Sequence, residues 1–248
     1  MSRRGALLSG LAICLVAVSS PAVGQELSID LGGEGALTLQ VVQLFVLLTV
    51  LSLAPGIAIM LTCFPFMVTV LSILRQAIGV QQAPPNMMIV SLALFLTWFV
   101  MAPVFNTAWE NGVAPLTAGE IDAEEGFNRT LAPFRTFMEG RADPDTMQVL
   151  QNAAPRGGPS VEDGGEGPPL SLLIPSFMLT EIKRGFEVGF LIFLPFLIID
   201  LVVASILMSM GMMMVPPAIV SLPFKLAFFV LADGWTLLAG ALVRGYGP

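Results

Sequence analysis

The chain has 248 residues, of which 55% are hydrophobic and only 12% are charged, and its formal net charge is −7. Soluble domains carry about 25% charged residues, so this composition is typical of a membrane protein. The sequence contains no histidine, which excludes Ser-His-Asp and Cys-His catalytic systems and histidine-bearing zinc sites. It also contains no basic patch and no Gly-rich phosphate loop. We therefore expect no nucleic-acid partner, no cofactor and no metal ion.

The first 24 residues are typical of a secretory signal peptide. Arg3 and Arg4 precede an apolar core over residues 5–18, and Ala22-Val23-Gly24 supplies small residues for a cleavage site. The alternative is a short helix that is not cleaved. After cleavage, residues 25–40 would form a short periplasmic N-terminal segment.

Apolar stretches fill most of residues 41–109. Residues 41–74 carry no charge and exceed the roughly 20 residues that one membrane span needs, but Pro55-Gly56 and Pro65 interrupt them. They form either a kinked span with a continuing helix or two half-length segments. Residues 87–109 form the next apolar segment and end in a tryptophan. We therefore predict a first helical hairpin over 41–109.

Residues 110–170 carry the acidity of the chain, with 11 of its 18 acidic and 4 of its 11 basic residues. Their net charge of −7 equals that of the whole chain, so we expect a water-exposed region, which we assign to the periplasm. Apolar residues at near-helical spacing predict some helical order in its first half. Residues 153–169 are rich in glycine and proline and predict a flexible linker.

Two further apolar stretches, 174–210 and 219–243, predict a second helical hairpin over 171–248. Lys183 and Arg184 precede Glu187 by four and three residues, so these charges can pair along one helix.

Three charges lie inside the apolar stretches of this second hairpin: Asp200, Lys225 and Asp233. An aspartate at the centre of a bilayer costs about 2.5–3.5 kcal/mol, so a partner is expected. A bridge from Asp200 to Lys225 between neighbouring helices or subunits would supply one. The two interpretations are an ion or proton relay and a pair that fixes an assembly; the lack of histidine and of further carboxylates favours the second.

The segment 208–217 joins the two stretches of the second hairpin and is rich in methionine. Its methionines are Met208, Met210, Met212, Met213 and Met214. Gly211, Pro216 and Pro217 end the helix and shape the loop. Methionine side chains are flexible and polarizable, so this cluster predicts a soft apolar surface that deforms at low cost. Ordinary core or lipid-facing packing is the alternative.

The positive charges do not follow the usual membrane topology rule. With the N-terminus outside after cleavage, Lys183, Arg184 and Arg244 also fall outside, while the inner loop 208–217 carries no positive charge. The positive-inside rule is therefore poorly obeyed. Either the topology differs, or protein partners hold these helices more than lipid does.

Seven short blocks follow one another in a characteristic order and spacing between residues 40 and 240. They are Leu74–Gly79, Ala83–Asn86, Leu92–Thr97, Phe190–Val202, Gly211–Pro217, Leu222–Leu226 and Asp233–Trp235. Jointly they resemble the FliP family of the bacterial flagellar export gate, which is shared with the equivalent type III secretion subunit. Many relatives carry an arginine in the first long helix where this chain has Phe66, after Pro65 in place of threonine.

The resemblance implies an all-α subunit built from bent hydrophobic helical hairpins. Several copies would assemble with FliQ and FliR, next to other membrane proteins of the flagellar export apparatus. The gate would lie in the bacterial inner membrane at the flagellar basal body, raised largely out of the bilayer plane. The family's methionine loop lines the channel constriction, which carries over to Met212, Met213 and Met214, with Met208 and Met210 just before it.

We therefore expect a non-enzymatic, pore-forming subunit that conducts unfolded flagellar proteins through a methionine gasket. The alternative is a secondary transporter with broken helices, in which Pro55-Gly56 and Asp200 would mark the ion site. That alternative predicts inverted repeats, which the sequence does not show. An intramembrane enzyme would need a nucleophile and a base, and no recognisable pair is present.

Overall fold

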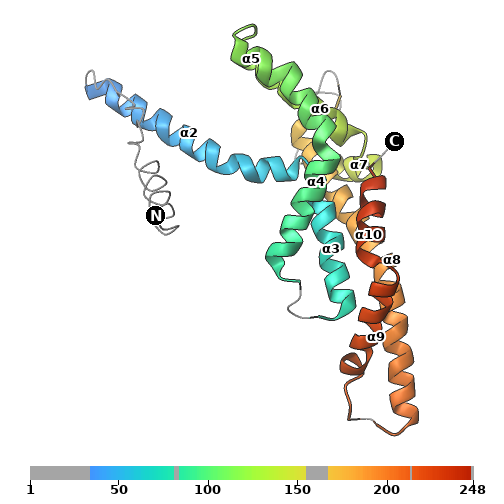
Figure 1. The fold of residues 1–248 in the computed structure, drawn as a ribbon. Helices are drawn as coiled ribbons and strands as arrows, with labels where there is room; N and C mark the ends of the chain where they lie inside the picture. Colours follow the sequence, from blue (N-terminus) through green and yellow to red (C-terminus); the bar gives the residue numbers. More distant parts are fainter. Residues whose placement is uncertain (1–33, 81–83, 155–166, 213, 247–248) are drawn as a thin grey trace, which may run out of the picture. The chain divides into compact units, whose positions relative to one another are not determined.

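The computed structural model (Figure 1) describes residues 34–80, 84–154, 167–212 and 214–246. All regular elements among these residues are helices, which confirms the expected all-α class. The predicted signal peptide over 1–24 lies outside the described residues, as does most of the predicted linker. The chain divides into two compact units, Met1–Leu51 and Ser52–Pro248.

Three helices among the described residues are long and apolar enough to cross a membrane, and a bent pair of helices gives a fourth candidate. The first, α2 (Glu34–Met60), is apolar on all sides, and large side chains such as Phe45, Leu48 and Leu51 are exposed along it. A helix that is hydrophobic all round is typical of a membrane span. The chain is thus a membrane protein by its helices as well as by its composition.

The long uncharged stretch breaks once, just after α2. The hydroxyl of Thr62 donates to the carbonyl of Ile59 at 2.9 Å and accepts from the amide of Phe64 at 3.4 Å, which holds a tight turn over 61–63. The next helix, α3 (Phe64–Ile78), has Pro65 in its first turn, where the missing amide proton is not needed. The range predicted as one hairpin therefore holds three helices, α2, α3 and α4.

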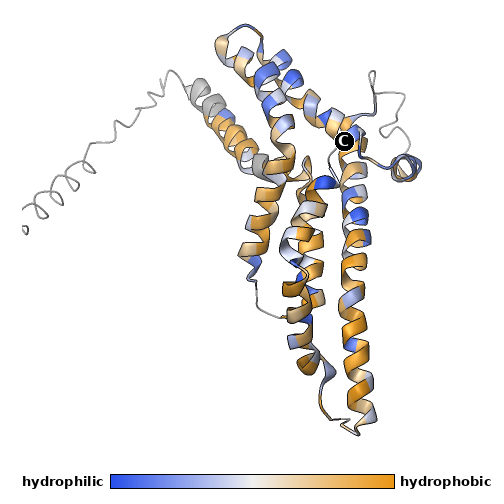
Figure 2. Cartoon of the chain, turned by 45° about the vertical axis from the view of Figure 1, so that its right-hand side comes forward, coloured by the Kyte–Doolittle hydropathy of each residue, from blue (hydrophilic) through white to orange (hydrophobic). Residues whose placement is uncertain are grey.

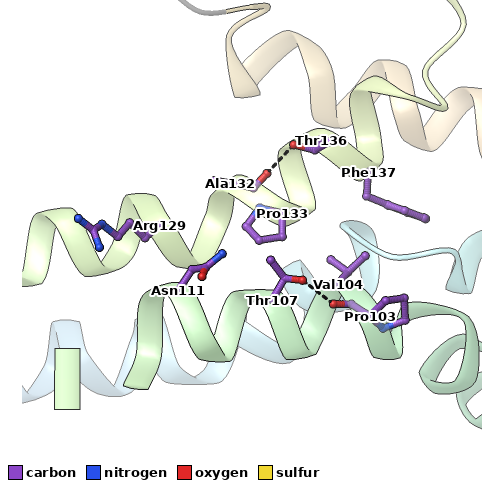
Figure 3. A pocket seen from close by; sticks show the side chains of 9 residues that line it. All are labelled: Pro103, Val104, Thr107, Asn111, Arg129, Ala132, Pro133, Thr136 and Phe137. Atoms are coloured by element: carbon purple, nitrogen blue, oxygen red, sulfur yellow. Dashed lines mark hydrogen bonds between the residues drawn. The ribbon is translucent and has the colours of Figure 1, made fainter. Parts of the chain in front are cut away.

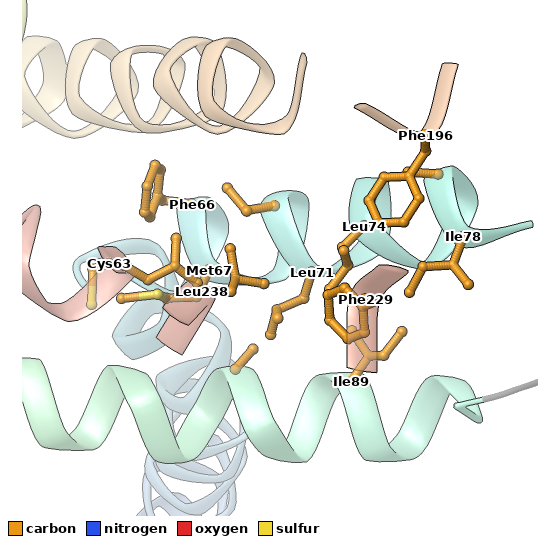
Figure 4. Close-up of a cluster of buried hydrophobic side chains, with 14 of the residues drawn as sticks. Cys63, Phe66, Met67, Leu71, Leu74, Ile78, Ile89, Phe196, Phe229 and Leu238 are labelled. Atoms are coloured by element: carbon orange, nitrogen blue, oxygen red, sulfur yellow. The ribbon is translucent and has the colours of Figure 1, made fainter. Parts of the chain in front are cut away.

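The core of the second unit surrounds α3, although α3 is too short to span a bilayer. Met67, Val70 and Leu74 are fully or almost fully buried between α4 (Asn86–Ala108) and α8 (Leu170–Ser209). Figure 4 shows side chains from the C-terminal helices, among them Phe196, Phe229 and Leu238, closing over the same cluster.

Two glycines let α8 approach α3 closely. A Cβ atom on Gly185 would lie 3.0 Å from Cβ of Thr69, and one on Gly189 would lie 2.3 Å from Cδ1 of Ile73. Small residues four apart are a common device for close helix contact. The G-x-x-x-G of this chain therefore forms the contact between its own α3 and α8.

The acidic region is helical through much of its length. The chain continues from α4 through a π-helical turn, η1 (Trp109–Val113), and α5 (Ala114–Ala118) before it reverses. It then forms α6 (Ala123–Glu139) and α7 (Pro144–Ala153), whose first turns are capped by the carboxylates of Asp122 and Asp143. Helix α6 packs against α4 and η1, and α7 packs against α8, so these helices belong to the second unit.

The second predicted hairpin begins with α8, whose 40 residues span about 60 Å, twice the roughly 30 Å of a bilayer's hydrocarbon core. Figure 2 shows most polar positions in its N-terminal half and a nearly continuous apolar C-terminal half. The chain returns through α9 (Pro217–Leu231) and α10 (Gly234–Arg244), which meet at an angle of 62°. The last apolar stretch is thus two helices rather than one.

Candidate functional site

The methionine segment forms the turn between α8 and α9. Gly211 has φ = 76°, a left-handed conformation that glycine adopts without cost. Its amide donates to the carbonyl of Met208 at 3.0 Å, and the amide of Met212 donates to that of Leu207 at 2.9 Å. This pair of bonds is the Schellman motif, which satisfies the last carbonyls of α8. Pro216 and Pro217 then begin α9.

The methionine side chains at this turn are exposed. The exposed fractions are 59% for Met208, 67% for Met210, 43% for Met212 and 98% for Met214, while Met213 lies outside the described residues. Burying a methionine side chain contributes about 1.5–3 kcal/mol, so this surface favours contact with another apolar surface over contact with water.

An open groove of about 510 Å³ lies beside the methionine turn, between α8 and α9. It is lined by apolar side chains alone: Ile198, Ile199, Val202, Val203, Ile206, Leu207, Met210, Met212, Val220 and Phe224. The turn and the groove together make one deformable apolar tip, and no ionisable side chain lies among their described residues.

Asp200 and Lys225 are brought together within one chain. Nζ of Lys225 lies 2.6 Å from Oδ2 of Asp200 and also donates to the carbonyl of Ala77 at 3.0 Å. The hydroxyl of Ser221 donates to Oδ1 of Asp200 at 2.6 Å. The bridge therefore joins α8 and α9 to each other and to the last turn of α3, where Lys225 supplies a donor to one of the carbonyls that the helix end leaves without an intrahelical partner.

Asp233, the third charge predicted in this group, lies elsewhere. Its side chain is exposed, and it makes no ion pair or capping hydrogen bond with any residue that the structure describes. It occupies the corner between α9 and α10. Burial of Asp233 in an assembly of several chains stays a prediction.

A second buried charge site was not found by the sequence analysis. Glu181 of α8 is fully buried, and its Oε1 lies 2.8 Å from Nε of Arg141, in the turn between α6 and α7, and 3.7 Å from Nη1 of Arg184. The hydroxyl of Tyr246, near the C-terminus, donates to the other carboxylate oxygen. Arg141 and Tyr246 are 40 and 65 residues away from Glu181, so no local spacing predicts these two partners.

Aromatic rings close this buried site. The guanidinium of Arg141 lies 3.8 Å from the centroid of the Tyr246 ring, a cation–π contact. The ring also contacts Phe66 edge-on, at 5.4 Å between centroids, and lies almost parallel to Phe137 at 6.2 Å. Burial, with the negative charge of Glu181, raises the pKa of Tyr246 well above its usual range, so its hydroxyl remains a donor. Phe66 is thus part of this aromatic cover.

Lys183 and Arg184 pair with acidic residues other than the predicted Glu187: Lys183 with a residue outside α8, and Arg184 with one three residues earlier on α8. Nζ of Lys183 lies 3.2 Å from Oδ2 of Asp143, and Arg184 lies near Glu181. The amide of Asp143 also donates to Oγ1 of Thr180 at 3.0 Å. The start of α7 is therefore tied to α8.

The tie between Asp143 and Lys183 should depend on pH. The hydrogen bond from Lys183 lowers the pKa of Asp143 below its ordinary 3.8, so the folded chain holds this proton less tightly than the unfolded chain. Its contribution to stability is therefore present above about pH 4 and is lost as the pH falls further. Asp143→Asn keeps the cap but not the charge. Between pH 5 and pH 3, it should lose about 1–2 °C less in thermal midpoint than the natural chain.

Circular dichroism of the two proteins at several pH values checks this expectation, and Lys183→Met should behave like Asp143→Asn. If the thermal midpoints of all three proteins fell equally between pH 5 and pH 3, the expectation would be contradicted.

A further groove of about 720 Å³ lies between α4 and α6 (Figure 3). The hydroxyls of Thr107 and Thr136 on its wall are bonded to carbonyls of their own helices, at 2.9 and 3.2 Å. Asn111 and Arg129 also line it. Among the residues that the structure describes, neither this groove nor any other place gathers three side chains that could hold a metal ion.

Comparison with known proteins gives a consistent result. The sequence profile of the FliP family matches residues 47–242. A protein of Caulobacter vibrioides named flagellar biosynthetic protein FliP is 49% identical over 246 residues, which cover 98% of this chain and 91% of the relative. Proteins of the same name from Rhizobium meliloti and Bacillus subtilis are 48% and 44% identical. They cover 94% and 83% of this chain, and the matches span 96% and 91% of their own lengths.

Proposed function

The chain belongs to the FliP family, and from this premise we propose that it is a pore-forming subunit of the flagellar protein export gate. As a family member it is a flagellar biosynthetic protein and a component of the flagellar export apparatus. The proposed substrates are unfolded flagellar proteins that cross the inner membrane. No catalytic step is assigned to the chain itself.

The observation that carries this proposal is the exposed methionine turn between α8 and α9. Met210 and Met214 point apolar, flexible side chains away from the chain's own core, at 67% and 98% exposure. A hydrophobic constriction holds back ions and water by dewetting. Thioether side chains from several copies would close such a constriction and repack around a passing polypeptide of changing side chains. We name this ring of turns the methionine gasket.

An oligomer is proposed because one chain leaves too much apolar surface uncovered. On α8 alone, Phe186, Phe190, Leu191 and Leu201 are each at least 60% exposed. Large contiguous apolar patches mark protein or membrane contacts. We propose several copies in a complex with FliQ and FliR, with residues 110–170 in the periplasm. Asp200 and Lys225 would then hold α8 and α9 in the geometry that the assembly needs, rather than carry ions.

Replacing Met212, Met213 and Met214 with alanine should raise ion leakage across the inner membrane several-fold while the complex still assembles. Alanine is too small to fill the constriction, and the turn keeps Gly211 and both prolines. Conductance of the bacterial inner membrane, measured with export-gate complexes present, checks this. Met87→Ala/Met88→Ala is the matched control, because these methionines are also exposed but lie on α4. Equal conductance in both variants and in the natural protein would rule out the gasket.

The secondary transporter remains the alternative, and purification separates it from the gate. A gate subunit extracted in mild detergent should form a large ring-like oligomer with its partners. A monomer or dimer that transports a solute alone would support the transporter.

A further inference from the structure

The corner between α9 and α10 has the features of a hinge. Asp233 has φ = 49° and ψ = 47°, and it is the only non-glycine residue with positive φ among the described residues. Aspartate tolerates this left-handed conformation but does not favour it as glycine does. A Cβ atom on Gly234 would lie 2.2 Å from the Phe229 ring, so only glycine leaves room for the ring at the corner. The 62° bend is therefore held against a local backbone preference.

The other end of α10 is fastened by the buried charge site. Tyr246 donates to the fully buried Glu181, and Arg141 covers its ring. Nη1 of Arg141 also donates to the carbonyl of Gly245 at 3.2 Å. Hydrogen bonds to charged groups are among the strongest in proteins, and more so when the charge is buried. The bend at Asp233 is what brings Tyr246 back to this site.

The space beneath α10 is incompletely filled. An open groove of about 480 Å³ runs between α10, α8 and the start of α3. Leu238 and Leu242 line it from α10, and Phe66, Leu191 and Phe196 line it from the opposite side. The groove is open at the surface, so α10 rests on the chain through a few buried side chains, among them Leu238 and Leu242, beside apolar surface that is left uncovered.

From these three observations we propose that residues 232–246 form a hinged arm with two states. The latched state is the one in the structure, with Tyr246 bound to Glu181 and Arg141. In the released state the contacts of Tyr246 are broken, α9 and α10 run more nearly straight, and the groove under α10 opens. The rest of the second unit stays folded in both states. The proposal is independent of the methionine gasket, because it concerns the opposite end of the hairpin.

Hydrogen exchange on the full-length chain in lipid nanodiscs tests the latch. Tyr246→Phe removes one hydroxyl and keeps the ring, so it should speed exchange of the α10 amides about tenfold or more. The α3 amides should be unchanged and serve as the internal reference. Thr236→Ala, which alters an exposed side chain on the same helix, is the matched control and should leave α10 exchange as it was.

A distance measurement tests the hinge in the same preparation. Spin labels at Ile219 and Arg244, both exposed, report the angle between α9 and α10. In Tyr246→Phe/Asp233→Ala the distance should lengthen toward the roughly 38 Å that 25 residues of continuous helix span. In Asp233→Gly, which keeps the left-handed corner, the distance should remain that of the natural chain.

Either of two results would overturn the proposal of a hinged arm. Unchanged α10 exchange in Tyr246→Phe would show that the hydroxyl fastens nothing. Faster exchange in α3 and α10 alike would show that Tyr246 is an ordinary part of the core and that no separate arm exists.

Discussion

Lys225→Met should destabilise the folded chain by about 3 kcal/mol. The substitution leaves Asp200 without its cation and the Ala77 carbonyl without its donor, 2.6 and 3.0 Å away. Removing one partner of a buried pair typically costs 3–5 kcal/mol, and the lower end applies because the Asp200 side chain is 33% exposed. Unfolding in detergent, followed by circular dichroism, measures the loss.

The double variant Asp200→Asn/Lys225→Met tests whether the two residues stabilise the fold through their interaction with each other. It should recover most of the stability, because no unpaired charge remains and Ser221 can still bond the amide. Lys183→Met is the matched control: it breaks an ion pair whose lysine is exposed to solvent and should cost far less stability than Lys225→Met. Additive losses in the double variant would show that Asp200 and Lys225 are not coupled.

Gly112→Ala should have the next largest effect, about 2 kcal/mol of lost stability. A Cβ atom at this position would lie 2.5 Å from the amide nitrogen and 2.7 Å from Cα of Thr130. The clash is with the backbone of α6, which cannot rotate away as a side chain can, so α6 must move off η1. The thermal midpoint should fall by several degrees.

Gly140→Ala is the matched control for this second substitution. Gly140 lies in the same region with φ = −66°, and its nearest neighbour would be 3.5 Å from the added Cβ, an ordinary contact. Its thermal midpoint should stay close to that of the natural chain. Equal losses for Gly112→Ala and Gly140→Ala would show that the α6–η1 contact is not tight.

The apolar stretches of the sequence predicted the helices well, because membrane helices need long runs without charge. They did not predict the positions at which the helices end or bend. Pro55-Gly56 interrupts the first stretch in the sequence, but α2 continues through it to Met60. The actual break at 61–63 depends on the Thr62 side chain, and the bend at Asp233 depends on a backbone angle. Pro65 and the Asp233-Gly234 dipeptide stand beside these breaks, but neither fixes the residue at which the helix ends.

The candidate site also contains features that the sequence predicts and features that it does not. The methionine turn was predicted because its residues are consecutive and unusual in composition. The pairing of Asp200 with Lys225 was a hypothesis because isolated charges in apolar stretches need partners. The sequence does not predict the site around Glu181, because Glu181 lies in a segment with several charges that can pair along the helix. Its partners come from the turn after α6 and from the C-terminus, and only the tertiary fold brings them together.

The bond from Lys225 to the carbonyl of Ala77 has a consequence for biogenesis. These residues are 148 positions apart, so the ribosome needs about 7–30 s after making α3 before the donor emerges, at 5–20 residues per second. During that time the end of α3 lacks its cation, and Gly185 and Gly189 have yet to be synthesised for part of it. The end of α3 therefore gains this contact only after most of the chain has been made.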